Sequence, residues 1–501
     1  MPADYVLALD QGTTSSRAIV FDHDGRVVAS AQQEFPQGFP SPGHVTHDPE
    51  DIWQSQLAVA REAVAATPGG VTRIAAMGIT NQRETTLVWD RASGVPVAPA
   101  IVWQSRITAQ RCEDIRAAGH EPRVRALTGL PLDPYFSGPK IAYILDSAAG
   151  LRERAEEGEL CFGTVDSFLM WRLTGGREHL TDVSNASRTL LFDITRQAWD
   201  PWLCEVMGVP MAMLPRVRPS SAVLAETDAD LLGASLPIAG VAGDQQAATF
   251  GQACLAPGSA KNTYGTGAFA LLNSGTKPIA SEHGLLSTIL WQLGEAGDVV
   301  YALEGSVFVA GAAVQWLRDG LKALERSADV ERLAATGDRA SGVIVVPAFT
   351  GLGAPHWDSA ARGAIMGLTL GSNLADIALA TVDAMAYQVA DVLDAMALDA
   401  SGDLGSLRVD GGAAVNDGLL QFQADLLQIP VERPRVTETT ALGAAFLAGL
   451  ATSFWSSTEE VAATWALERR FEPAMKAGQR DRLIDRWHDA VERTKSWPAI
   501  D

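Results

Sequence analysis

Residues 6–28 read VLALDQGTTSSRAIVFDHDGRVV and predict the first structural unit of the chain. An apolar run over Val6–Leu9 ends before Gly12, and a second apolar run covers Ile19–Phe21. The Asp24-Gly25 pair that follows is typical of a tight turn and predicts a third strand directly after it. The chain therefore opens with three short, consecutive strands.

A second unit of the same form occurs in the other half of the chain. Residues 261–272, KNTYGTGAFALL, again place a Gly-Thr pair at the bend between two apolar stretches. Two such units favour two lobes that each contribute one turn to a central cleft. Two unrelated glycine turns would leave the same pattern, so the spacing alone does not decide between these interpretations.

Strands alternate with helices between and after these units, which predicts an α/β layered fold. The first helical spacing of apolar residues starts at Asp51, just after Pro49. Breaks near Gly251 and Pro257 place the expected lobes at residues 1–252 and 253–501. After residue 450, four tryptophans lie among many charges, which predicts peripheral helices on the second lobe: Trp455, Trp465, Trp487 and Trp497.

The composition excludes several classes of protein. Of the 501 residues 47% are hydrophobic and 20% are charged, as in folded globular chains, so disordered and collagen-like classes are excluded. The formal net charge of −21 repels nucleic acid and anionic membranes, although a local turn can still bind a small anion such as ATP.

Cysteine spacing and hydropathy bear on the compartment. The four cysteines form no C-x-x-C pair and are expected to be reduced core thiols: Cys112, Cys161, Cys204 and Cys254. No secretory pattern opens the chain, and no stretch reaches the roughly 18 apolar residues of a membrane span. We therefore expect a cytoplasmic protein.

Residues 10–17, DQGTTSSR, combine a carboxylate, a glycine, four hydroxyl residues and Arg17. Backbone N–H groups, hydroxyls and a guanidinium can surround a polyphosphate, and Asp10 suits a metal ion, whereas the alternative is an ordinary polar turn. The chain has no G-x-x-x-x-G-K-[ST] string and no H-R-D or D-F-G string, so the P-loop and protein-kinase classes are excluded.

Residues 81–86, NQRETT, follow an apolar strand at the place where α/β folds bind ligands. Adjacent Arg83 and Glu84 offer the donor and acceptor that a small polyol needs, although such a pair is also typical of a solvated ion pair. Trp103 and Tyr135 could supply an apolar wall and a phenol, or simply be core aromatics.

Two further strand ends carry candidate chemistry. The small-residue strand 237–243 leads into Asp244, which could accept a hydroxyl proton or merely cap a helix. The glycine pair after Asp410 could admit a base and ribose, or form a plain turn. The sequence TALGAAFLAG, residues 440–449, predicts a tightly packed helix.

Nine strings taken in order resemble the glycerol kinases of the FGGY carbohydrate kinase family: DQGTTSSR, NQRETT, WQSR, YFSGPK, AGDQQAA, KNTYGTG, GLGAPHWD, DGGAAVND and TALGAAFLAG. The resemblance spans residue 5 to about residue 450. It implies two ribonuclease-H-like, actin-like lobes that close on ATP and a substrate.

The resemblance also assigns roles by position. Glycerol would contact Arg83, Glu84, Tyr135, Asp244 and Gln245, with Trp103 and Phe269 as an apolar wall. ATP would contact Thr13, Thr14, Ser15, Arg17, Thr266, Gly311, Gln315, Gly412 and Asn416. Asp10 and Asp244 would face Mg²⁺.

The activity implied is ATP-dependent phosphorylation of glycerol to sn-glycerol 3-phosphate, with Asp244 as the catalytic residue, in a homodimer or homotetramer. Residues 228–236, DADLLGASL, carry neither a cation nor a histidine, so sugar-bisphosphate inhibition and activation by histidine phosphorylation are not expected. Alternatives are a kinase of another polyol or ketose, an actin- or chaperone-like ATPase, and a sugar-sensing regulator, against which the acidic balance argues.

Overall fold

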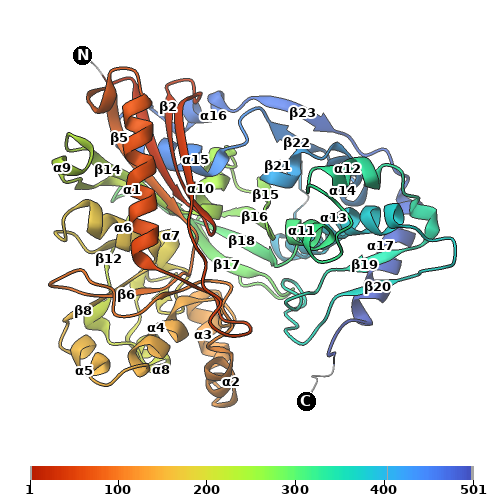
Figure 1. Cartoon of the computed structure of the whole chain (residues 1–501), viewed down its shortest axis with the longest axis horizontal. Helices are drawn as coiled ribbons and strands as arrows, with labels where there is room; N and C mark the ends of the chain where they lie inside the picture. Colours follow the sequence, from red (N-terminus) through yellow and green to blue (C-terminus); the bar gives the residue numbers. More distant parts are fainter. Residues whose placement is uncertain (1–2, 403, 498–501) are drawn as a thin grey trace.

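The computed structural model describes residues 3–402 and 404–497 and contains two large mixed sheets, one in each lobe (Figure 1). The first sheet has six strands in the order β13-β14-β5-β1-β2-β3. Their bounds are β1 Tyr5–Gln11, β2 Ser15–Asp22, β3 Val27–Glu34, β5 Ile74–Asn81, β13 Ser221–Glu226 and β14 Pro237–Gly243. The three opening strands predicted from the sequence are confirmed.

The second sheet has seven strands in the order β17-β18-β16-β15-β21-β22-β23. Their bounds are β15 Ala260–Tyr264, β16 Ala268–Gly275, β17 Leu286–Gln292, β18 Val299–Val307, β21 Leu407–Asp410, β22 Val431–Pro434 and β23 Leu467–Phe471. The strand-turn-strand unit predicted at residues 261–272 is β15 and β16.

The two sheets share one topology. In the first, β1 pairs antiparallel with β2 and β2 with β3, whereas β5 and β14 run parallel to β1. In the second, β15, β16 and β18 repeat the antiparallel part, and β21 and β22 repeat the parallel part. The two Gly-Thr turns are therefore equivalent positions of two lobes of one design, which confirms the two-lobed ribonuclease-H-like fold.

Helices α1 (Pro49–Ala66) and α6 (Val165–Leu173) cover the outer face of the first sheet. Helix α1 begins two residues before the predicted start because Asp48 accepts a hydrogen bond from the backbone N–H of Glu50. The other face packs against α10 (Asp244–Gly251) and α15 (Thr439–Ala451), which lie between the two sheets.

Small residues allow α10 and α15 to approach each other and the first sheet closely. A Cβ atom on Gly443 would lie 1.8 Å from the carbonyl oxygen of Ala247, and one on Gly78 would lie 2.2 Å from that of Ala444. The predicted tight packing of residues 440–449 is confirmed.

The core on the remaining face of the second sheet includes residues of five helices: α11 (Gly311–Asp319), α12 (Asp329–Ala334), α13 (Leu374–Ala400), α14 (Asp417–Leu427) and α17 (Ala477–Glu492). Trp487 on α17 is buried in this core, as expected for the C-terminal segment, and Trp497 is exposed.

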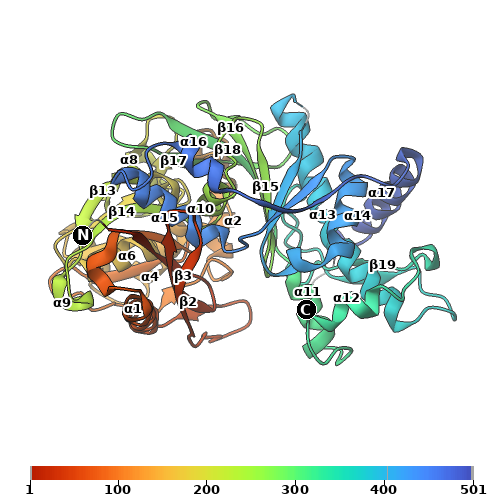
Figure 2. The ribbon, with the colours of Figure 1, turned by 90° about the horizontal axis from the view of Figure 1, so that it is seen from above.

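The expectation that the helices after residue 450 all pack on the second lobe is wrong for one segment. Trp455, which lies between α15 and α16 (Thr458–Thr464), packs in one core with Val461 of α16 and with Val6 and Phe446. The Trp455 indole N–H donates to the carbonyl of His23 in the β2–β3 turn. Seen from above, the blue helices α15 and α16 lie among elements of the first lobe (Figure 2). Helix α15 is apolar on all sides, as expected for a helix buried between two sheets. The segment that follows it packs on the first lobe.

An insertion between β5 and β13 completes the first lobe. It carries α2 (Ala109–Ala117), α3 (Glu121–Thr128), α4 (Ser137–Asp146), α5 (Leu151–Glu156), α7 (Val183–Ala186) and α8 (Pro201–Met207), and α9 (Ala229–Leu232) lies between β13 and β14. All four cysteines are free and buried, as predicted. Within residues 3–402 and 404–497, none of the helices combines the length and apolarity needed to cross a bilayer.

The close crossing of α10 and α15 can be tested with Gly443→Ala. The added methyl group would overlap the Ala247 carbonyl, so we expect the free energy of unfolding to fall by about 1–3 kcal/mol. Urea denaturation measures this change. Gly478→Ala is the matched control, because a Cβ there meets no atom within 4 Å; equal losses in both variants would contradict the packing argument.

Candidate active site

A cavity of about 140 Å³ lies between the lobes at the carboxyl ends of β5 and β14. It is lined by Thr13, Arg83, Glu84, Trp103, Tyr135, Asp244, Gln245, Thr263, Gly265, Thr266, Gly267 and Phe269. The structure therefore brings together every residue expected to contact glycerol, with Thr13 of the first Gly-Thr turn and Gly265, Thr266 and Gly267 of the second beside them.

Arg83 and Glu84 both reach this cavity because the chain makes a tight turn after β5. The backbone N–H of Thr85 donates to the carbonyl of Arg83 over 2.7 Å, and Glu84 has a positive φ of 59°. This is a γ-turn of the strained kind. In an extended strand the side chains of consecutive residues point to opposite faces, and the turn allows those of Arg83 and Glu84 to reach the same cavity. The exposed fractions of Arg83 and Glu84 are 3% and 1%, which excludes a solvated surface ion pair.

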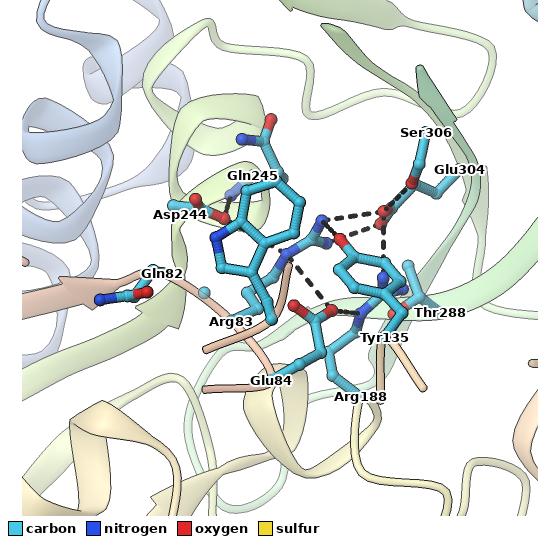
Figure 3. Close-up of polar contacts among 12 residues, drawn as sticks. Gln82, Arg83, Glu84, Tyr135, Arg188, Asp244, Gln245, Thr288, Glu304 and Ser306 are labelled. Carbon is cyan, nitrogen blue, oxygen red and sulfur yellow. Dashed lines mark hydrogen bonds and ion pairs between the residues drawn. The ribbon is translucent and has the colours of Figure 1, made fainter. Parts of the chain in front are cut away.

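The two residues belong to a buried network of four charges (Figure 3). The guanidinium of Arg83 donates to both carboxylate oxygens of Glu304 over 2.6 and 2.8 Å. Arg188 donates to Glu84 over 2.6 Å and to Glu304 over 3.1 Å. Two cations and two anions therefore compensate one another away from water.

The charges in this network set its protonation states. Burial alone would raise the pKa of Glu304, but Arg188 and Arg83 outweigh it and lower that pKa to about 2. Burial raises the pKa of the Tyr135 phenol, which therefore keeps its proton. The phenol oxygen accepts a hydrogen bond of 3.3 Å from Arg83, which leaves its O–H as a donor.

Three aromatic side chains form one wall of the cavity. The Trp103 ring meets Tyr135 edge-to-face at 5.7 Å and Phe269 at 6.0 Å between ring centroids. The Trp103 indole N–H donates to Thr13 over 2.9 Å, which connects this wall to the first Gly-Thr turn. Trp103 and Phe269 thus occupy the positions expected of an apolar wall.

Asp244 is the first residue of α10, and its side chain is 32% exposed. Its carboxylate lies 3.2 Å from Arg83 Nε and accepts a hydrogen bond from the backbone N–H of Gln245, the next residue of the helix. The N-cap position itself is Gly243, so Asp244 is not the capping residue that the alternative interpretation expected. Burial in the cleft raises its pKa, whereas Arg83 and Lys261 act in the opposite direction. The charge of Asp10 raises it further, which places the two carboxylates within electrostatic reach.

Gln245 is held by a lysine that the sequence did not single out. The Lys261 ammonium donates to the amide oxygen of Gln245 and to the hydroxyl of Thr263. The NH₂ end of the Gln245 amide is therefore left as the donor that faces the cavity.

The first Gly-Thr turn places Thr13 and Thr14 between β1 and β2, and Ser15 is the first residue of β2. Arg17 follows on β2 and bridges two carboxylates, at 2.5 Å from Asp10 and 2.6 Å from Glu438. Glu438 directly precedes α15, so this bridge joins distant parts of the chain. A phosphate that bound Arg17 would compete with both carboxylates.

The second Gly-Thr turn is tied to the start of α11. Backbone N–H groups of Gly311 and Ala312 donate to the carbonyls of Gly265 and Thr266 over 3.0 Å each. Gln315 is exposed on α11, Gly412 opens a short 3₁₀ turn, and Asn416 caps α14. These last three residues are not in the wall of the cavity but lie on the second lobe, where the resemblance places the nucleotide.

Sequence reasoning missed Glu304 and Arg188. Both are fully buried charged residues, and Glu304 interrupts an apolar strand, VVYALEGSV. A carboxylate in the middle of such a strand is a signal that a buried cation must lie opposite. The sequence could not identify that cation, because Arg83 is far away along the chain.

Comparison with known proteins identifies the family. Residues 5–251 match the N-terminal domain, and residues 260–452 the C-terminal domain, of the FGGY family of carbohydrate kinases. The chain belongs to this family. It is 56% identical over 499 residues to a glycerol kinase of Symbiobacterium thermophilum, with 100% of each chain covered. It is also 56% identical over 493 residues to a glycerol kinase of Deinococcus radiodurans, with 98% of each covered.

Solved structures agree with this assignment. The crystal structure of Plasmodium falciparum glycerol kinase with ADP has a TM-score of 0.90 and 32% identity, covering 99% of each chain. A ligand-bound xylulose kinase from Lactobacillus acidophilus has a TM-score of 0.87 at 20% identity, covering 98% of each chain, and shares the fold.

The buried network can be tested with Glu304→Gln. The substitution leaves two arginines facing one carboxylate, so we expect the free energy of unfolding to fall by about 3–5 kcal/mol in urea denaturation. Glu295→Gln is the control, because Glu295 pairs with Arg218 with its side chain 65% exposed. That surface pair should contribute less than about 1 kcal/mol. Equal effects of the two substitutions would show that the network contributes no special stability.

Proposed function

We propose that the protein transfers the γ-phosphoryl group of ATP to a terminal hydroxyl of glycerol, giving sn-glycerol 3-phosphate and ADP. One observation carries the proposal: a small cavity joins the buried Arg83 and Glu84 to Asp244 and to both Gly-Thr turns. The glycerol kinases that are 56% identical over the full chain support it.

Glycerol offers three hydroxyl groups on an apolar carbon chain, and the cavity is complementary to both features. The carboxylate of Glu84 accepts and the guanidinium of Arg83 donates, with Tyr135 and the Gln245 amide as further donors. The hydroxyls would replace the long contacts of Arg83, at 3.2 Å to Asp244 and 3.3 Å to Tyr135, and leave its short contacts with Glu304 intact. Trp103 and Phe269 would cover the carbons.

Asp244 is the group we assign to the reacting hydroxyl. Its carboxylate takes the hydroxyl proton as the glycerol oxygen bonds to the γ-phosphorus and the bond from that phosphorus to the ADP oxygen breaks. Thr13, Thr14, Ser15 and Arg17 would hold the phosphates from one lobe, and Thr266 and Gly311 from the other. Gln315, Gly412 and Asn416 would contact the nucleoside.

The donor set fits a magnesium ion. Mg²⁺ is usually held by one or two carboxylates together with substrate phosphates and water, and Asp10 and Asp244 are two carboxylates within electrostatic reach. When bound, the ion would neutralise phosphate charge.

The assigned role of Asp244 can be tested with Asp244→Asn. We expect kcat to fall by about 10²- to 10⁴-fold, the range for loss of a general base, with a much smaller change in glycerol affinity. Steady-state kinetics with varied glycerol and ATP give both values. Asp230→Asn is the control, because Asp230 is exposed in the first turn of α9. Near-normal turnover by Asp244→Asn would assign Asp244 another role.

The substrate can be tested by a coupled ADP-release assay with glycerol, dihydroxyacetone, xylulose and no acceptor. We expect the largest kcat/KM with glycerol and little release without an acceptor, because lobe closure excludes water. A preference for xylulose would favour a pentulose kinase, and release independent of an acceptor would favour an ATPase.

We further propose a cytoplasmic homodimer or homotetramer on the basis of the family resemblance. Light scattering on the purified protein would give its oligomeric state.

A further inference from the structure

The backbone carbonyl of Glu84 is a focus of hydrogen bonds inside the first lobe. It accepts from the hydroxyls of Thr86 and Ser137 over 3.0 and 3.1 Å, and from the Lys140 ammonium over 3.3 Å. Glu84 is the central residue of the strained γ-turn, and a strained backbone persists only where its surroundings fix it. The three donors supply that restraint.

Lys140 reaches this carbonyl from the first turn of α4. Ser137 and Lys140 are three positions apart on the helix, so both side chains lie on one face and meet the same carbonyl. The ammonium also donates to the backbone carbonyl of Tyr135 over 2.6 Å. One side chain therefore connects the backbones of two residues that line the cavity, although Lys140 does not line it.

A lysine is an unusual choice for this position. Its side chain has no solvent exposure, and both of its hydrogen-bond acceptors are neutral carbonyls. Burying an ammonium group without a directly paired anion is costly. Burial lowers the pKa of Lys140 to about 7, and the nearby charges of Glu84 and Asp133 oppose that shift. The cost of burying the Lys140 ammonium implies that its hydrogen bonds to the two carbonyls have a role.

We propose that Lys140 is a positioning residue of the polyol site: its ammonium ties the carbonyls of Glu84 and Tyr135 together and so fixes the Glu84 carboxylate relative to the Tyr135 phenol. The inference rests on the proposed function, in which these two side chains bind glycerol. Lys140 does not line the cavity, so it acts only through the backbones of Glu84 and Tyr135.

Lys140→Met tests the proposal, because methionine is similar in length and has no donor. We expect the KM for glycerol to rise by about 10- to 100-fold, the effect of losing charged hydrogen bonds, with the KM for ATP changed less than about 2-fold. Circular dichroism and thermal unfolding verify the fold. Lys277→Met is the matched control, because Lys277 is exposed in a loop.

A double-mutant cycle with Glu84→Gln separates positioning from a general loss of structure. If Lys140 acts through Glu84, the effects of the two substitutions on glycerol KM will be clearly less than additive. Additive effects, equal rises in both KM values, or an unchanged glycerol KM would overturn the proposal. No glycerol-dependent ADP release by the wild-type protein would instead count against the proposed function.

The wild-type protein provides a second test if Lys140→Met does not fold. As pH rises through about 7, Lys140 loses its proton and its contacts with the two carbonyls weaken, so the glycerol KM should rise while the ATP KM stays level. Burial lowers the pKa of Lys261, which holds Gln245, to about 8, so the rise that reports on Lys140 must begin below that pH. The groups that face Lys140 are Glu84, Asp133, Arg106 and Cys112, and burial raises the pKa of Cys112 to about 12. A glycerol KM that stays level from pH 6 to pH 8.5 would overturn the proposal.

Discussion

The site depends on one buried carboxylate, Glu304, which lies between Arg83 and Arg188. Glu304 comes from β18 of the second sheet, and both arginines come from the first lobe. Because the two buried arginines would otherwise share the single buried carboxylate of Glu84, this contact balances their charge, joins the lobes and holds Arg83 at the cavity. The tight turn at Glu84 depends on the same contact. It places the Glu84 carboxylate beside Arg83 and Arg188, and both arginines are also paired with Glu304.

Much of the fold could be predicted from local sequence. The apolar runs on either side of the Gly-Thr turns at Gly12 and Gly265 predicted two strand-turn-strand units, and the small residues of 440–449 indicated a tightly packed helix. Their equivalence could not be derived in this way, because the order of strands in a sheet depends on pairings between distant segments. The position of Trp455 on the first lobe was missed for the same reason.

The residues of the candidate site also fall into those that local sequence marks and those that depend on distant contacts. Arg83, Glu84 and Asp244 stand at strand ends, where the sequence pattern alone marks them as candidates. Glu304, Lys140 and Lys261 lie inside strands or helices and Arg188 lies in the turn after α7, and each matters through a partner remote in sequence. The apolar strand around Glu304 signals a buried charge, but a single sequence does not show which distant residue compensates it.

The return of the chain to the first lobe affects how the molecule can fold. The first sheet is complete at β14, but its inner face is covered by α15, which begins at Thr439. During synthesis on a ribosome, that apolar face would stay exposed until nearly the whole polypeptide had emerged. The N-terminal half therefore lacks the helix that covers this face until the end of synthesis, and its folding is tied to that of the C-terminal half.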